Sequence, residues 1–98
     1  MQKNLEEIQT IVIPIARAHG VKKLSVFGSR ARGDNKIDSD YDFLISKGQI
    51  TGMISYLSFV NDLEDALGTH VDVVTDTTED TMFLDEIKKD EVVLYEQT

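Results

Sequence analysis

The chain has 98 residues, and 10 lysines and arginines against 18 aspartates and glutamates give a formal net charge of −8 at pH 7. At this length we expect a single domain with a modest core over residues 1–98. The acidic balance argues against nonspecific binding to nucleic acid or to an anionic membrane, because both require a basic surface. With no cysteine, the chain cannot use disulfides, thiolate nucleophiles or cysteine-ligated zinc. Neither a signal segment nor a bilayer-spanning apolar stretch is present, so we expect a cytoplasmic protein.

The first half of the chain predicts a helix followed by two strands. Asn4 is placed to cap the helix, with Glu7 completing a capping box, and Gly20 is placed to end it. Pro14 removes one helical hydrogen bond, so we expect a kink or a break into two helices. Residues 24–27 then predict a strand, 29–33 a turn or short helix, 34–38 a polar loop and 40–46 a second strand.

The second half alternates helix and strand. An apolar face with helical spacing runs from Met53 to Leu67 and is closed by Gly68. Residues 71–74 predict a third strand, Thr78 is placed to cap a last helix that ends near residue 89, and residues 92–95 predict a short final strand. This order predicts an α/β fold, with a small mixed sheet and flanking helices.

The most informative motif is a Gly28-Ser29 pair followed, after ten residues, by Asp40-Tyr41-Asp42 at the start of an apolar strand. Carboxylates two residues apart on a strand point to the same face. That arrangement suits a hard divalent cation such as Mg²⁺, which takes oxygen ligands and shares them with phosphates. A turn with Gly and Ser can bring backbone N–H groups and a hydroxyl to those phosphates. The motif therefore predicts a metal- and nucleotide-dependent transfer reaction.

A third candidate carboxylate is Asp72, which lies between two valines of the third expected strand. Acids in apolar strands favour a functional site, because an unpaired buried charge is costly. The alternative is that the three acids lie at strand ends in solvent. Spacing also allows His70 to line the site, but a simple strand-end histidine is the favoured interpretation, and His19 is better explained as a helix cap.

Two arginines follow the Gly-Ser pair. Arg30 and Arg32 are candidates to contact a triphosphate, because guanidinium matches phosphate geometry. The alternative is that one or both are solvated or paired with acids. A calcium loop beginning at Asp38 is excluded, because Phe43 and Gln49 stand where it needs a glycine and an acid. No P-loop motif is present.

Three segments together resemble a known family: residues 28–33 (GSRARG), 39–45 (SDYDFLI) and 71–75 (VDVVT). They resemble the minimal nucleotidyltransferases of the DNA polymerase beta-like superfamily, whose stand-alone members commonly serve as antitoxins beside a HEPN-domain toxin. The resemblance implies a minimal nucleotidyltransferase fold. It also implies that Asp40 and Asp42 hold two Mg²⁺ ions, that Asp72 is the third catalytic and metal-binding carboxylate, and that Gly28 and Ser29 bind the phosphates of ATP.

The reaction implied by this resemblance is transfer of AMP from ATP to a hydroxyl of the partner toxin, with tyrosine as the expected acceptor. The short chain agrees, because it has no residues left for a second domain that would hold an acceptor. Two alternatives stay open: an antitoxin that neutralises by binding alone, and nucleotide transfer to tRNA. The net charge of −8 weighs against the second alternative.

Overall fold

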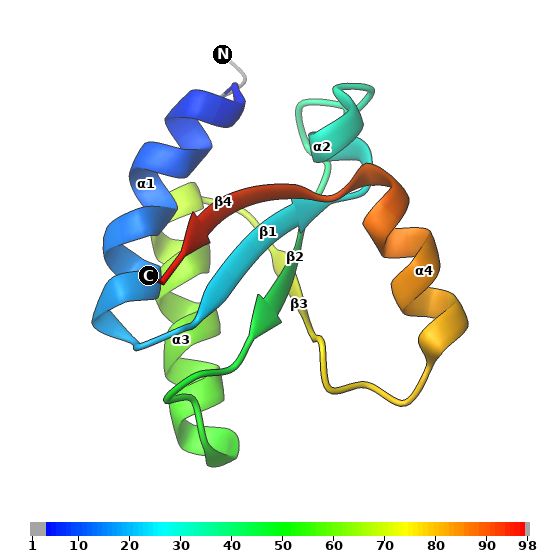
Figure 1. Ribbon diagram of the computed structural model, residues 1–98. Coiled ribbons are helices and arrows are strands. Elements are labelled where there is room, and N and C mark those ends of the chain that lie inside the picture. The colour runs from blue at the N-terminus through cyan, green and yellow to red at the C-terminus, as the bar shows by residue number, and fades with distance from the viewer. Residues whose placement is uncertain (1–3, 98) are drawn as a thin grey trace.

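The computed structural model describes residues 4–97. Its helices are arranged around one sheet, as Figure 1 shows. The elements follow the order that the sequence predicts. They are α1 (Leu5–Ala18), β1 (Lys23–Phe27), α2 (Ser29–Arg32), β2 (Tyr41–Ser46), α3 (Gly52–Leu67), β3 (Val71–Thr75), α4 (Thr81–Asp90) and β4 (Val92–Glu96).

The sheet has the strand order β3-β2-β1-β4 and is mixed, as expected. Strand β1 is antiparallel to both of its neighbours, whereas β2 and β3 are parallel. The end of β1 therefore meets the starts of β2 and β3 at one end of the sheet. In the register of these strands, Phe27 lies opposite Asp42, and Asp42 lies opposite Asp72.

The two faces of the sheet carry different layers. Helices α1 and α3 lie together on one side of the sheet and α4 lies on the other (Figure 1). Side chains from α1, α3 and alternate strand positions form the core: Ile8, Val12, Leu24, Val26, Phe43, Ile45, Phe59 and Leu63. Because neighbouring strand positions point to opposite faces, Asp42 lies on the face away from this core. Within residues 4–97, no helix combines the length and the apolar composition needed to cross a bilayer.

Helix α1 begins as predicted, with Asn4 Oδ1 accepting a hydrogen bond of 2.9 Å from the backbone N–H of Glu7. At Pro14 the sequence predicts a kink or a break into two helices, and the break is wrong, because the helix continues without interruption to Ala18. Pro14 is exposed, while Val12 and Ala16 on the inner face are buried. Packing of that inner face holds the helix together across the missing hydrogen bond.

The start of α4 also differs from the prediction. Thr78 does not cap the helix; its N–H donates to the carbonyl of Thr75 in a turn that follows β3. The cap is Asp80, whose side chain accepts a hydrogen bond of 2.9 Å from the N–H of Phe83. Asp and Thr are both good caps, so the local sequence allows the helix to begin after Thr78 or after Asp80. Because Thr78 takes part in the turn that follows β3, the helix begins after Asp80.

Strand β3 lies at an edge of the sheet, where unpaired backbone groups favour association with other chains. Side chains of α3 cover part of this edge. The Glu64 carboxylate accepts a hydrogen bond of 3.0 Å from the N–H of Val71, and the Tyr56 hydroxyl donates one of 2.9 Å to the carbonyl of Val73. These contacts also fix Glu64 beside the start of β3.

Candidate active site

Three acidic side chains gather where β1 ends and where β2 and β3 begin. Asp40 immediately precedes β2, Asp42 is its second residue, and Asp72 is the second residue of β3. One ligand atom each from Asp40, Asp72 and His70 lie within 4.8 Å of one another. The expectation of a plain strand-end histidine is therefore wrong, because His70 lines the carboxylate cluster.

Asp42 is the least exposed of the three carboxylates. Burial raises the pKa of Asp42 above its usual range, and the charges of Asp72 and Asp40 raise it further. The positive charge of Arg32 acts in the opposite direction and lowers the pKa of Asp42. Three carboxylates that repel one another in this way bind a cation favourably, because the cation relieves the repulsion.

Gly28 brings the Gly-Ser turn against this cluster. Its φ of +75° lies in the region that favours glycine, and a Cβ on it would stand 2.7 Å from Asp42 Oδ2. The Gly28 carbonyl accepts hydrogen bonds from Ala31 and Arg32, and Ser29 begins α2. The fold thus places the two parts of the motif side by side.

Arg30 points away from solvent, with 7% of its surface exposed. Its guanidinium donates to the carbonyl of Ser39 at 2.6 Å and lies 4.2 Å from the ring centre of Tyr41. A weaker contact of 3.4 Å reaches the carbonyl of Ile37. These contacts attach α2 to the loop that carries Asp40, so the structure favours an internal partner for Arg30 over a bound phosphate.

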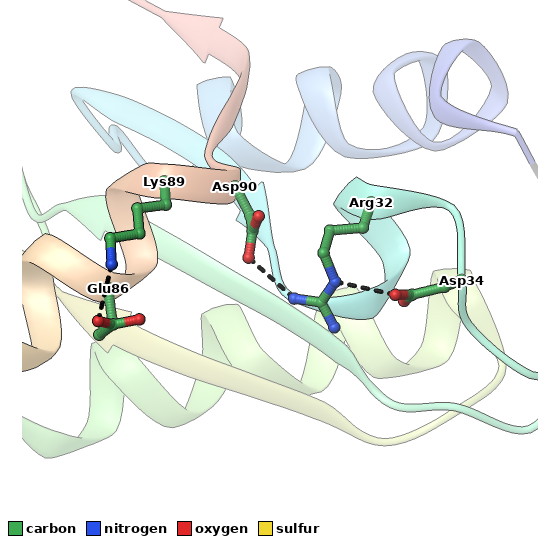
Figure 2. A network of polar contacts seen from close by, with 5 residues as sticks. All are labelled: Arg32, Asp34, Glu86, Lys89 and Asp90. Carbon is green, nitrogen blue, oxygen red and sulfur yellow. Dashed lines mark hydrogen bonds and ion pairs between the residues drawn. The ribbon is translucent and has the colours of Figure 1, made fainter.

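Arg32 links the ends of two helices, as Figure 2 shows. Its Nε lies 3.0 Å from Asp34 Oδ2, and its Nη1 lies 2.8 Å from Asp90 Oδ2 at the end of α4. These two partners raise the pKa of Arg32, Asp34 more than Asp90. Arg32 is therefore paired with acids, which is one of the two interpretations that the sequence allows. Its guanidinium is still close enough to lower the pKa of Asp42.

A surface cavity of about 540 Å³ opens beside the cluster. Asp42 and Asp72 belong to its lining, and apolar side chains form most of the remainder: Phe27, Leu57, Val60, Val71, Val73, Val74 and Phe83. The carboxylates therefore face a recess that combines charge with apolar walls, which is the usual character of a small-molecule site.

The sequence of this chain matches the family model "Polymerase beta, Nucleotidyltransferase" over residues 7–98. The chain belongs to this nucleotidyltransferase family. MJ0435 of Methanocaldococcus jannaschii, which carries a provisional protein adenylyltransferase name, is 42% identical over 72 residues, covering 74% of this chain and 77% of that protein. The protein adenylyltransferase MntA of Thermococcus cleftensis is 36% identical over 74 residues, covering 71% of this chain and 75% of MntA.

A solved structure shares the fold. It is the complex of a tri-AMPylated HEPN toxin with an MNT antitoxin from Shewanella oneidensis, and it matches with a TM-score of 0.72 at 17% identity. The match covers 95% of this chain and 73% of the other chain. This agreement supports the small mixed α/β fold expected for a minimal nucleotidyltransferase.

Proposed function

We propose that this nucleotidyltransferase moves AMP from ATP onto a hydroxyl of a HEPN toxin, with tyrosine as the preferred acceptor, and thereby acts as the antitoxin. The observation that carries the proposal is the juxtaposition of Asp40, Asp42 and Asp72 with the Gly28–Ser29 turn. The adenylyltransferase names of two relatives, and the AMPylated toxin held by the Shewanella antitoxin, support the same activity. Action as a single domain in the cytoplasm is part of the proposal.

The donor set of the site fits Mg²⁺. Asp40 and Asp72 are exposed carboxylates, and the pKa of Asp42 is raised by burial and then by the charges of Asp72 and Asp40. Hard oxygen donors of this kind are what Mg²⁺ requires, and we assign Asp40, Asp42 and Asp72 as ligands of two ions. When bound, the ions supply positive charge to the triphosphate and to the acceptor oxygen.

The residues of the chain position the reactants in this proposal. Gly28 and Ser29 hold the β- and γ-phosphates, and Arg32 adds a guanidinium near them. The acceptor oxygen attacks the α-phosphorus, the bond to the leaving pyrophosphate breaks, and Asp72 takes the hydroxyl proton. Arg30, assigned to the nucleotide on sequence grounds, acts instead by holding the loop that carries Asp40.

Neutralisation by binding alone is the second candidate. It needs no carboxylate cluster, so the gathering of three acids at one end of the sheet, two of which (Asp42 and Asp72) line a cavity, favours the enzyme. Transfer to tRNA is disfavoured by the net charge of −8, because an RNA substrate brings its own dense negative charge.

The decisive experiment mixes the purified chain, Mg²⁺-ATP and a purified HEPN toxin, which is to be sought in the reading frames next to that of this chain. Intact-mass spectrometry should show the HEPN protein heavier by one or more AMP units, with this chain unmodified. The matched control is Asp40→Asn with Asp42→Asn, which should remain folded by circular dichroism and transfer nothing. Toxin that is neutralised without a change in mass would establish the binding-only alternative.

A further inference from the structure

His70 and Glu64 are the side chains beside the cluster that the sequence motif does not include. His70 directly precedes β3 and is exposed, and Glu64 comes from the fourth turn of α3. His70 Nε2 lies 3.0 Å from Asp72 Oδ1, and His70 Nδ1 lies 3.1 Å from Glu64 Oε2. The imidazole therefore stands between the carboxylate cluster and a fourth carboxylate behind it.

This arrangement is typical of a metal-binding histidine, with His70 as the ligand and Glu64 as the carboxylate that supports it. A metal-binding histidine usually gives its second ring nitrogen to a carboxylate, which fixes the orientation of the ring. Glu64 is itself held in place, because the same oxygen accepts the hydrogen bond of 3.0 Å from the backbone N–H of Val71. The orientation of the His70 ring therefore depends on Glu64, which is held by its hydrogen bond to the backbone of β3.

The distances suit shared coordination by Asp72 and His70. Neighbouring ligands of an octahedral ion stand about 3.0 Å apart when each is about 2.1 Å from the ion. The 3.0 Å between His70 Nε2 and Asp72 Oδ1 matches this value. The third donor, from Asp40, lies within 4.8 Å of both, and all three side chains are exposed, so small rotations bring the donors together.

We infer that His70 supplies a nitrogen ligand to the metal site, supported by Glu64, and that this ligand shifts the preference of the site from Mg²⁺ towards Mn²⁺ and later transition ions. The inference rests on the metal site of the proposed function and deepens it. Imidazole binds transition ions well, whereas Mg²⁺ prefers oxygen ligands throughout. The chain should therefore hold Mn²⁺ more tightly than Mg²⁺ before any nucleotide arrives.

The test uses Mn²⁺ alone with the full-length, untagged protein. Pulsed electron paramagnetic resonance should detect a nitrogen nucleus coupled to bound Mn²⁺ in the wild type. His70→Gln should abolish this coupling and weaken Mn²⁺ binding by about tenfold or more, while Mg²⁺ affinity changes less. Glu64→Gln should keep the coupling and weaken Mn²⁺ binding, because the ring stays present but loses its support.

His19→Gln is the matched control, because His19 is the only other histidine of the chain and pairs with Asp62 on α3 instead of the cluster. Nitrogen coupling should persist in this variant. Coupling that is missing from the wild type or retained in His70→Gln overturns the inference, as does a wild type that binds no Mn²⁺. AMP transfer is assayed separately, so transfer without nitrogen coupling overturns only this inference, and coupling without transfer overturns only the proposed function.

Discussion

At the scale of single residues, position 28 requires glycine for two reasons, its backbone conformation and the lack of space for a side chain. Its φ of +75° and ψ of −152° belong to a region used almost only by glycine, and a Cβ there would meet Asp42 Oδ2 at 2.7 Å. Gly28→Ala should cost about 2 kcal/mol of stability and displace the Asp42 carboxylate, so AMP transfer should be lost. Urea unfolding and transfer assays on the folded protein measure the two effects.

Gly33 provides the control for Gly28, because it also has a positive φ, +85°, but a Cβ on it would have no atom within 4 Å. Gly33→Ala should lose about 1 kcal/mol of stability from backbone strain and keep its transfer activity. Equal loss of activity in the two variants would show that contact with Asp42 is not the reason for glycine at position 28.

Asp42 also makes the stability of the fold depend on pH. Burial, followed by the charges of Asp72 and Asp40, raises its pKa in the folded protein above the unfolded value. The folded state therefore holds this proton more tightly, so the group favours folding at low pH, and this contribution is lost as pH rises through the folded pKa.

Asp42→Asn should raise the free energy of unfolding near pH 7 by roughly 0.5 kcal/mol, a small value because solvent screens a partly exposed carboxylate. This increase in the free energy of unfolding should disappear at about pH 3, where the wild-type carboxyl is mostly protonated. Urea titrations at the two pH values test this, with Asp65→Asn, an exposed carboxylate outside the cluster, as the control. A variant less stable than the wild type near pH 7 would contradict the prediction.

At the scale of elements, Arg30 is the connection between α2 and the loop before β2. Its guanidinium contacts the carbonyls of Ser39 and Ile37 and the ring of Tyr41, and its Nε is buried without a partner. Lysine has no planar group to stack on the Tyr41 ring, and it lacks the N–H donors that a guanidinium holds in a fixed plane. Arg30→Lys should therefore cost about 1–2 kcal/mol of stability and weaken metal binding, because Asp40 belongs to the same loop.

The matched change is Arg17→Lys, because Arg17 is an exposed arginine of α1 that lies 6.0 Å from the ring centre of Tyr95. It should alter stability by less than about 0.5 kcal/mol and leave metal affinity unchanged. Urea unfolding and Mn²⁺ titration of both variants give the comparison. Similar losses in the two would show that the loop does not depend on Arg30.

At the scale of the whole molecule, the charge of −8 and the carboxylate cluster act together on the nucleotide. A triphosphate that approaches three carboxylates is repelled unless a cation bridges them. ATP should therefore bind at least about fivefold more weakly in EDTA than in Mg²⁺, because two like unit charges about 4 Å apart repel each other by about 1 kcal/mol in water. Calorimetry at matched ionic strength measures both affinities, and equal values would contradict the metal-bridged site.

The order of helices and strands, the mixed α/β class and the spacing of the Gly-Ser and Asp-x-Asp parts could be predicted from the sequence alone. These features depend on neighbours along the chain: the apolar period of Met53 to Leu67 requires a helix, and two acids two residues apart on a strand share a face. The roles of Asp40, Asp42 and Asp72 at the metal remain predictions, which the variants above test.

Other features were decided only by tertiary packing. Arg30 is turned inward because a distant loop offers it carbonyl oxygens, and Pro14 is tolerated because the opposite side of α1 is packed. His70 joins the cluster because the parallel pairing of β2 with β3 sets Asp40 beside it, and because α3 places Glu64 behind its ring. Such contacts join residues far apart in the chain, and local sequence periodicity carries no information about which of them meet.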